Sequence, residues 1–95
     1  MIALDTISSG EFEACLQEKF LLPVADGKLL LELASVTVLP GGRPEAKRAP
    51  FSLVFHAPHP IRLPQAIYRL EHERLGAMEL FLVQVGPTAI EAVFS

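Results

Sequence analysis

Three histidines and a single cysteine are the side chains of this chain best suited to binding a metal or to catalysis. Zinc requires three or four converging nitrogen, oxygen or sulfur ligands. His56 and His59 lie in the proline-bounded stretch His-Ala-Pro-His-Pro, which predicts an exposed extended loop in which two imidazoles do not converge. Cys15 has apolar neighbours at helical spacing, as is typical of a small buried hydrophobe. The sequence therefore predicts no metal site and no cofactor.

The densest polar stretch surrounds His72, which could form an acid–base pair with Glu71 or Glu73. Successive residues of a strand point to opposite faces, so His72 and its neighbours would not share a pocket there. The alternation instead predicts Arg69 and Glu71 as a pair on a solvated face. Tyr68 and His72 are then expected to turn towards the core or towards an interface.

No nucleophile or phosphate-binding loop is indicated. The serines show no Gly-x-Ser-x-Gly elbow. Gly41-Gly42 lacks the further glycines, the Lys-Ser/Thr pair and the following helix that a phosphate loop requires. We therefore expect no catalytic residue and no enzymatic activity.

The length and charge of the chain exclude several classes of protein. Ninety-five residues fit one domain, spanning 1–95. The net charge of −3 lacks the basic face of a nucleic-acid binder, and the basic cluster Arg43, Lys47 and Arg48 predicts a solvated loop. No apolar run approaches the roughly 20 residues of a membrane helix. With a single Cys15 and no signal peptide, we expect cytoplasmic synthesis, although export by a specialised machine would leave no such mark.

One short helix is predicted over about residues 9–19. Ser8 with Glu11 three residues later has the spacing of a capping box, and Ile7 with Phe12 that of a hydrophobic staple. Phe12, Cys15 and Leu16 then form an apolar stripe with the i, i+3, i+4 spacing of one helix face.

Strands and turns are predicted from residue 20 to residue 94. An Asp-Gly turn follows 20–24, and the long run 28–39 changes the parity of its apolar positions. This change predicts a β-bulge near Ala34-Ser35, with burial of both faces as the competing explanation. A loop is expected over 40–45 because no sheet ladder tolerates its prolines and glycines.

The remaining strands alternate regularly. Residues 51–55 place Phe51, Leu53 and Phe55 on one face, and Gly76 can supply the positive φ of a tight turn between two later strands. About six strands in all predict a mainly β fold, a small antiparallel barrel or sandwich with one N-terminal helix.

Several segments carry a resemblance to a known family. They are Arg48 to Phe55, Leu63-Pro64-Gln65, Tyr68 to His72, Leu75-Gly76, Glu79 to Val83 and Glu91 to Phe94. Together they resemble a bacterial family of β-rich proteins of similar length, described only as a domain of unknown function. The chain departs from the family pattern at Ala66, where glycine is commoner, and at Gln84, where proline is commoner. The resemblance implies an association with genes for phage-tail-collar-like proteins and an accessory or structural role in a tail-like assembly, and it supplies no active site.

Excess apolarity is the remaining indication of function. Apolar residues make up 51% of the chain and the mean hydropathy is +0.38, more than one small core can hide. The strand after Gly76 is apolar on both faces, so its second face needs covering by the helix or by another subunit. The interface candidates are Phe81, Val83, Val85, Tyr68 and His72.

Three functions are compatible with these observations. The first is a non-enzymatic assembly subunit that binds a protein partner, most simply a second copy of itself. The second is an adaptor that binds a peptide or chain by strand addition. The third, a small metal-dependent enzyme, has the least support.

Overall fold

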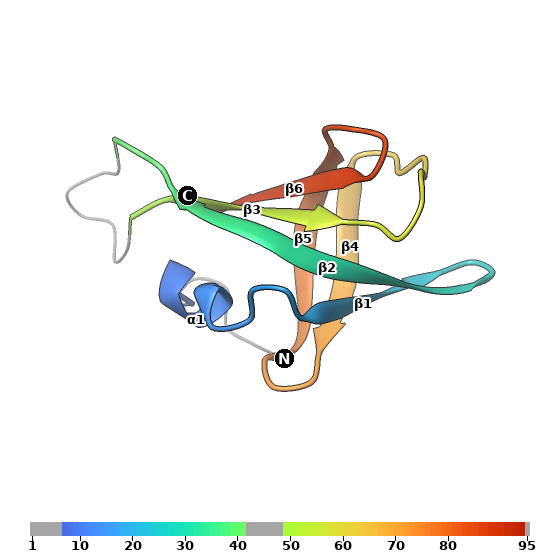
Figure 1. Cartoon of the computed structure of the whole chain (residues 1–95), viewed down its shortest axis with the longest axis horizontal. Helices are drawn as coiled ribbons and strands as arrows, with labels where there is room; N and C mark the ends of the chain where they lie inside the picture. The colour runs from blue at the N-terminus through green and yellow to red at the C-terminus, as the bar shows by residue number, and fades with distance from the viewer. Residues whose placement is uncertain (1–6, 42–48, 95) are drawn as a thin grey trace.

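The computed structural model describes residues 7–41 and 49–94 (Figure 1). The predicted basic cluster Arg43, Lys47 and Arg48, and residues 42–45 of the predicted loop, lie outside these described residues. The elements are α1 (Ser9–Glu13), β1 (Lys19–Val24), β2 (Gly27–Val38), β3 (Phe51–His56), β4 (Ala66–His72), β5 (Gly76–Gln84) and β6 (Ala89–Phe94).

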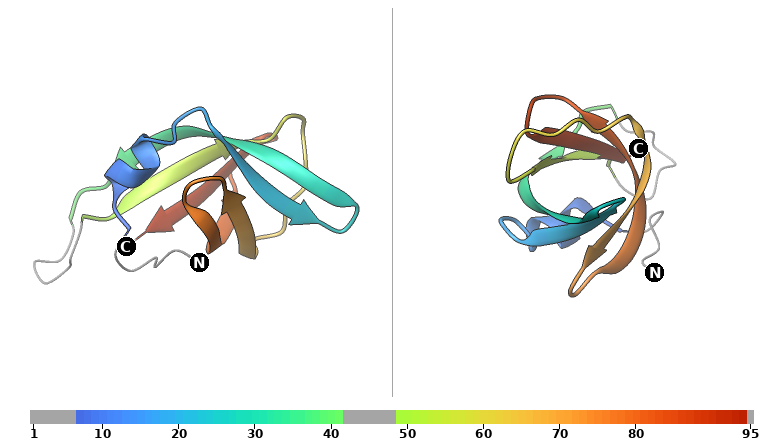
Figure 2. Two further views of the ribbon diagram at one scale, coloured as in Figure 1. Left: turned by 90° about the horizontal axis from the view of Figure 1, so that it is seen from below. Right: turned by 90° about the vertical axis from the view of Figure 1, so that its right-hand side faces the viewer.

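The six strands form a closed barrel in the order β1-β2-β3-β6-β5-β4, with all neighbours antiparallel. The sequence left barrel and sandwich open, and the structure shows the barrel. The right-hand view of Figure 2 shows the ring of strands. A short helix near the N-terminus accompanies it, as predicted. Among the described residues, no helix has the length and apolarity needed to cross a membrane.

The predicted alternation places the core inside this ring. Phe51, Leu53 and Phe55 of β3 are fully buried. On β5 the inward-facing Met78 and Leu82 are fully buried as well. The tight turn between β4 and β5 leads into Gly76, the first residue of β5, whose φ of 83° is a left-handed conformation that glycine adopts without steric cost.

The predicted β-bulge is present in β2. The register with β3 shifts between Leu33 and Ser35. Leu33 pairs with Phe55, and after the shift Val36 pairs with Leu53. Both apolar sets of β2 therefore point to the same side as the buried residues of β3. The bulge, and not burial of both faces, explains the change of parity.

The predicted helix over 9–19 is wrong beyond Glu13. The N–H of Cys15 bonds to the Phe12 carbonyl at 2.8 Å, a tight i→i−3 turn, and residues 14–17 form turns. Gln17 then takes φ 69° and its N–H bonds to the carbonyl of Leu33 in β2 at 2.8 Å. The helix ends because the chain must reverse here to enter β1.

Two finer predictions about this helix also fail. Ser8 is the N-cap residue, but its side chain makes no capping hydrogen bond, and the Glu11 N–H bonds to the Ser8 backbone carbonyl at 3.2 Å. The capping box is therefore absent. Of the predicted stripe, Phe12 and Cys15 are buried, whereas Leu16 is 40% exposed because the helix has already ended.

The short helix positions one aromatic side chain in the core. Figure 1 shows α1 beside the end of the barrel where β3 begins and β6 ends. The fully buried Phe12 ring has its centroid 5.4 Å from that of Phe94, 5.8 Å from Phe51 and 6.5 Å from Phe20. Tilted pairs at these distances are favourable aromatic contacts. Phe12 therefore fills this end of the barrel.

We expect Phe12→Ala to lower the free energy of unfolding by about 3–5 kcal/mol, because the cavity would lie among three other rings. Urea denaturation followed by circular dichroism measures this loss. Leu16→Ala is the matched control four residues along the chain, and its exposed side chain should cost less than about 1 kcal/mol. Equal losses in the two variants would contradict this role of Phe12.

Candidate functional site

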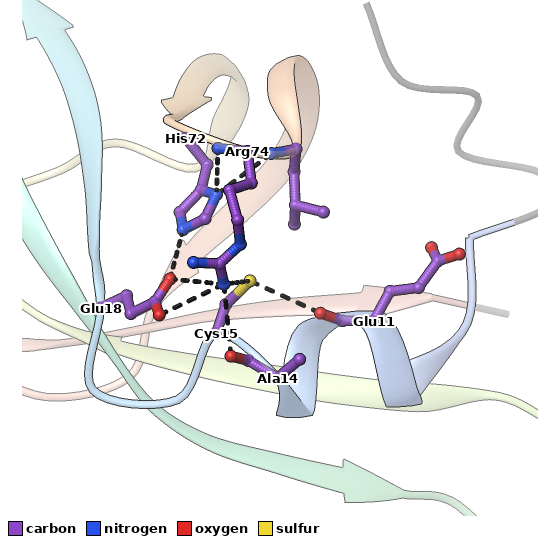
Figure 3. Close-up of polar contacts among 7 residues, drawn as sticks. Glu11, Ala14, Cys15, Glu18, His72 and Arg74 are labelled. Atoms are coloured by element: carbon purple, nitrogen blue, oxygen red, sulfur yellow. Dashed lines mark hydrogen bonds and ion pairs between the residues drawn. The ribbon is translucent and has the colours of Figure 1, made fainter.

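Four side chains that could do chemistry meet where the connection between α1 and β1 lies against the β4–β5 turn (Figure 3). They are Cys15, Glu18, His72 and Arg74. A ligand atom from each of Cys15, Glu18 and His72 lies within 4.8 Å of the other two. We call these four residues the Glu18 cluster.

His72 is buried at the centre of the cluster, with 6% of the residue exposed. Its Nδ1 accepts the backbone N–H groups of Arg74 at 3.1 Å and of Leu75 at 3.2 Å. A ring nitrogen that accepts N–H groups carries no proton, so the ring proton sits on Nε2. Nε2 then donates to Glu18 Oε1 at 2.8 Å. The geometry thus assigns a neutral imidazole whose two nitrogens are both engaged.

Arg74 completes the cluster from the solvent side. Its Nη2 donates to Glu18 Oε1 at 2.9 Å and to Oε2 at 3.2 Å. The same nitrogen lies 3.4 Å from the Ala14 carbonyl and 3.5 Å from Cys15 Sγ. Figure 3 shows the guanidinium between the carboxylate and the thiol. Charge-assisted hydrogen bonds of this kind are stronger than neutral ones.

These contacts shift the titration of two groups in opposite directions. The hydrogen bond from His72, reinforced by Arg74, lowers the pKa of Glu18 below its usual value. Burial raises the pKa of the Cys15 thiol, outweighing the hydrogen bond from Arg74. The thiol is therefore protonated at neutral pH, which makes it a poor nucleophile, and it contacts the Glu11 carbonyl at 3.5 Å.

The hydrogen bonds of the Glu18 cluster do not fit a metal ion. A histidine bound to metal through Nε2 normally keeps a proton on Nδ1 and donates it. Here Nδ1 accepts two N–H groups, so a metal on Nε2 would require a fully deprotonated ring. The Arg74 charge also lies 2.9 Å from the carboxylate. Instead, the hydrogen bonds of the cluster link segments that are 54 to 56 residues apart in the chain.

The other predicted polar residues lie elsewhere. Arg69 and Glu71 form the predicted pair on the solvated face, with Arg69 Nε 3.1 Å from Glu71 Oε2. His56 ends β3 and His59 follows it in the connection to β4, both exposed. Glu73 is exposed as well. None of these side chains joins His72.

The five interface candidates fall into two groups. Phe81 and Val85 are 52% and 55% exposed, and Val83 is half-buried. Tyr68 is half-buried, and its hydroxyl donates to the Pro64 carbonyl at 2.6 Å. His72 lies inside, in the Glu18 cluster. The predicted alternation of β5 is confirmed, and α1 does not cover its outer face at Phe81.

Two further features escaped the sequence analysis. Ile67 of β4 is 66% exposed and pairs directly with Phe81. Its shared parity with the solvated Arg69 could have revealed this outward position. The partnership of Glu18 with His72 and Arg74 carries no local signal, because the partners are far apart in sequence.

The fold is a small closed antiparallel β-barrel, and the Glu18 cluster links its α1–β1 connection to the β4–β5 turn. The chain belongs to the family described as a domain of unknown function, DUF6916, whose model matches residues 7–94. This confirms the resemblance as far as a family of unknown function. No curated protein and no solved structure matches the chain.

We expect Glu18→Gln to change how stability depends on pH. The unfolded carboxyl titrates near 4.5 and the folded one lower, so Glu18 contributes its full stabilisation above about pH 4.5. That contribution is lost as the pH falls through the lower folded value. The difference in melting temperature between wild type and Glu18→Gln should therefore be largest near pH 7 and shrink below pH 4.5.

Glu73→Gln is the matched control, because Glu73 has no ion pair among the residues that the structure describes. Its melting temperature should follow that of wild type throughout the titration. A difference in melting temperature between wild type and Glu18→Gln that stays constant with pH would contradict stabilisation by the ionised Glu18 carboxylate.

Proposed function

We propose that this protein is a non-enzymatic subunit of a larger assembly and that it binds its partner through the outer face of β4 and β5. The observation that carries the proposal is the cross-strand pair Ile67 and Phe81. These two large apolar side chains are directly opposed in the sheet, and more than half of each is exposed. Single exposed apolar residues are ordinary, but contiguous ones mark interaction surfaces.

The strand register extends this apolar surface. Val83 lies two residues beyond Phe81 on the same face of β5, and Val85 follows just past the end of the strand. Val83 pairs with Glu91 of β6, whose same-face neighbour Val93 is 59% exposed. We call Ile67, Phe81, Val83, Val85 and Val93 the outer apolar face. Covering it would remove from water the apolar surface that the barrel cannot bury.

A second copy of this chain is the partner that the charges beside the outer apolar face favour. Arg69 of β4 lies opposite Glu79 of β5 in the strand register, and its Nε lies 3.1 Å from Glu71 Oε2. The surface next to the outer apolar face therefore carries positive and negative side chains beside each other. In a two-fold arrangement the same patch meets itself, so the basic group of one copy can face the acidic groups of the other.

The hydrogen bonds of the Glu18 cluster support the non-enzymatic role. Cys15 is buried with a raised pKa, and both His72 nitrogens are occupied by hydrogen bonds. The family resemblance adds a setting: a bacterial, tail-like assembly whose subunit is made in the cytoplasm. We propose this setting together with the role.

We expect the purified protein to behave as a dimer in size-exclusion chromatography with multi-angle light scattering. Ile67→Lys/Phe81→Lys should dissociate it, because two ammonium groups would be desolvated at the contact. Val38→Lys is the control, since Val38 is 53% exposed and lies on β2, which does not neighbour β4, β5 or β6 in the barrel. Circular dichroism shows whether each variant keeps the fold. A wild-type monomer, or a control that dissociates as readily, would contradict self-association.

Strand addition remains the second candidate function, for one specific reason. A single residue pair, Leu21 with Glu71, joins β1 to β4, although each strand is six or seven residues long. Figure 1 shows the hairpin of β1 and β2 extending beyond the rest of the barrel. Strand backbone without ladder partners can accept an added strand. A stable monomer in the scattering experiment would favour this function over the first.

A further inference from the structure

A second group of polar side chains begins beside the Glu18 cluster, at Lys19, and lies on β1, β2 and the end of β3, not on the strands of the outer apolar face. A cleft of about 400 Å³ is found where the β1–β2 hairpin leaves the barrel and the chain passes from β3 into the connection to β4. The side chains that define its chemistry are Lys19, Lys28, Leu30, Glu32, His56 and His59.

The strand register explains why these residues gather. Lys19 of β1 pairs with Glu32 of β2, and Glu32 pairs with His56 of β3, so the three form one row across the sheet. Lys28 and Leu30 precede Glu32 on β2 at intervals of two and share its face. His59 approaches from the connection, where its Nδ1 lies 3.2 Å from the Pro60 carbonyl.

The charge of the cleft is opposite to that of the chain. Lys19 and Glu32 neutralise each other, with Nζ 3.0 Å from Oε1. Lys28 has no carboxylate partner among the residues that the structure describes. The lining therefore carries one uncompensated positive charge and two imidazoles, in a protein of net charge −3. Leu30 also lines the cleft, and its side chain, 46% exposed, offers an apolar contact to a ligand.

We propose that this cleft binds an extended peptide segment in which an acidic residue is followed two positions later by leucine, isoleucine or valine. Alternate side chains of an extended peptide share one face at the same spacing as Lys28 and Leu30 on β2. The acidic side chain would meet Lys28, and the apolar side chain would meet Leu30.

The openness of the cleft favours a peptide over a small molecule. Most of its lining is exposed, including Lys19, Lys28, Leu30, His56 and His59, so a ligand would be covered on one side only. Small-molecule sites usually enclose most of the ligand surface. An extended segment can instead pair with free strand backbone. Among the described residues, β2 pairs with β3 only from Glu32 onward, so the part of β2 that contains Lys28 and Leu30 offers such backbone.

The test uses fluorescence anisotropy with the full-length protein and a labelled, capped pentapeptide Ser-Glu-Ser-Leu-Ser. We expect saturable binding that weakens with added salt. A second probe, Ser-Lys-Ser-Leu-Ser, keeps the leucine and reverses the charge, and it should bind at least about tenfold more weakly.

Three variants locate the site. Lys28→Glu should weaken binding of the acidic peptide about tenfold or more, whereas Glu32→Gln should strengthen it because a repelling carboxylate is removed and Lys19 is released. Arg62→Glu is the matched control, an equal change of net charge at an exposed residue that does not line the cleft. Its affinity should stay within about twofold of wild type.

Each outcome decides the proposal. Opposite effects of Lys28→Glu and Glu32→Gln, with Arg62→Glu unchanged, support it. Equal weakening by Lys28→Glu and Arg62→Glu would show that only the overall charge matters and would overturn the proposal. Equal binding of the two peptides, or no saturable binding, would also overturn it. The cleft contains neither Ile67 nor Phe81, so Ile67→Lys/Phe81→Lys should bind the peptide like wild type. This separates the site from the proposed assembly surface.

Discussion

Closure of six strands around a single apolar interior is the constraint on which the rest of this structure depends. The barrel closes on itself, although β1 and β4 meet at a single residue pair, and its ends must still be covered. One end is filled by Phe12 from a helix of only five residues, in contact with rings from β1, β3 and β6. The helix can be this short because its packed side chain, and not its own hydrogen bonds, stabilises it.

The Glu18 cluster fixes the turn through which the chain enters the barrel. The turn after α1 contains Gln17 with a positive φ, a conformation that most side chains disfavour. Backbone hydrogen bonds to Leu33 and the side-chain bonds of Glu18 to His72 and Arg74 fix this turn to two parts of the sheet. The side chains of this cluster thereby link parts of the chain that are far apart in sequence.

The small size of the barrel has a consequence for its surface. An interior formed by alternate residues of short strands cannot accommodate half of the chain, so large apolar side chains such as Ile67 and Phe81 face outwards. The proposed assembly surface and the proposed peptide cleft lie on different strands. A subunit with these two sites could contact one partner through apolar area and another through charge.

The sequence by itself determined the features that depend on near neighbours. Strand parity predicted the buried face of β3, the two faces of β5 and the outward Arg69–Glu71 pair, because alternation is a property of any extended chain. The bulge near Ala34-Ser35 and the turn at Gly76 followed from the same local geometry. These are the parts of the fold that could be predicted with their residues.

Only the tertiary structure decided the features that depend on distant partners. The helix ends at Glu13, despite an apolar pattern that continues to Leu16, because Gln17 bonds to β2. Closure into a barrel instead of a sandwich depends on contacts such as Leu21 with Glu71, fifty residues apart. Parity turned His72 towards the core or an interface, but its partner Glu18 lies 54 residues away, a separation that no local pattern encodes.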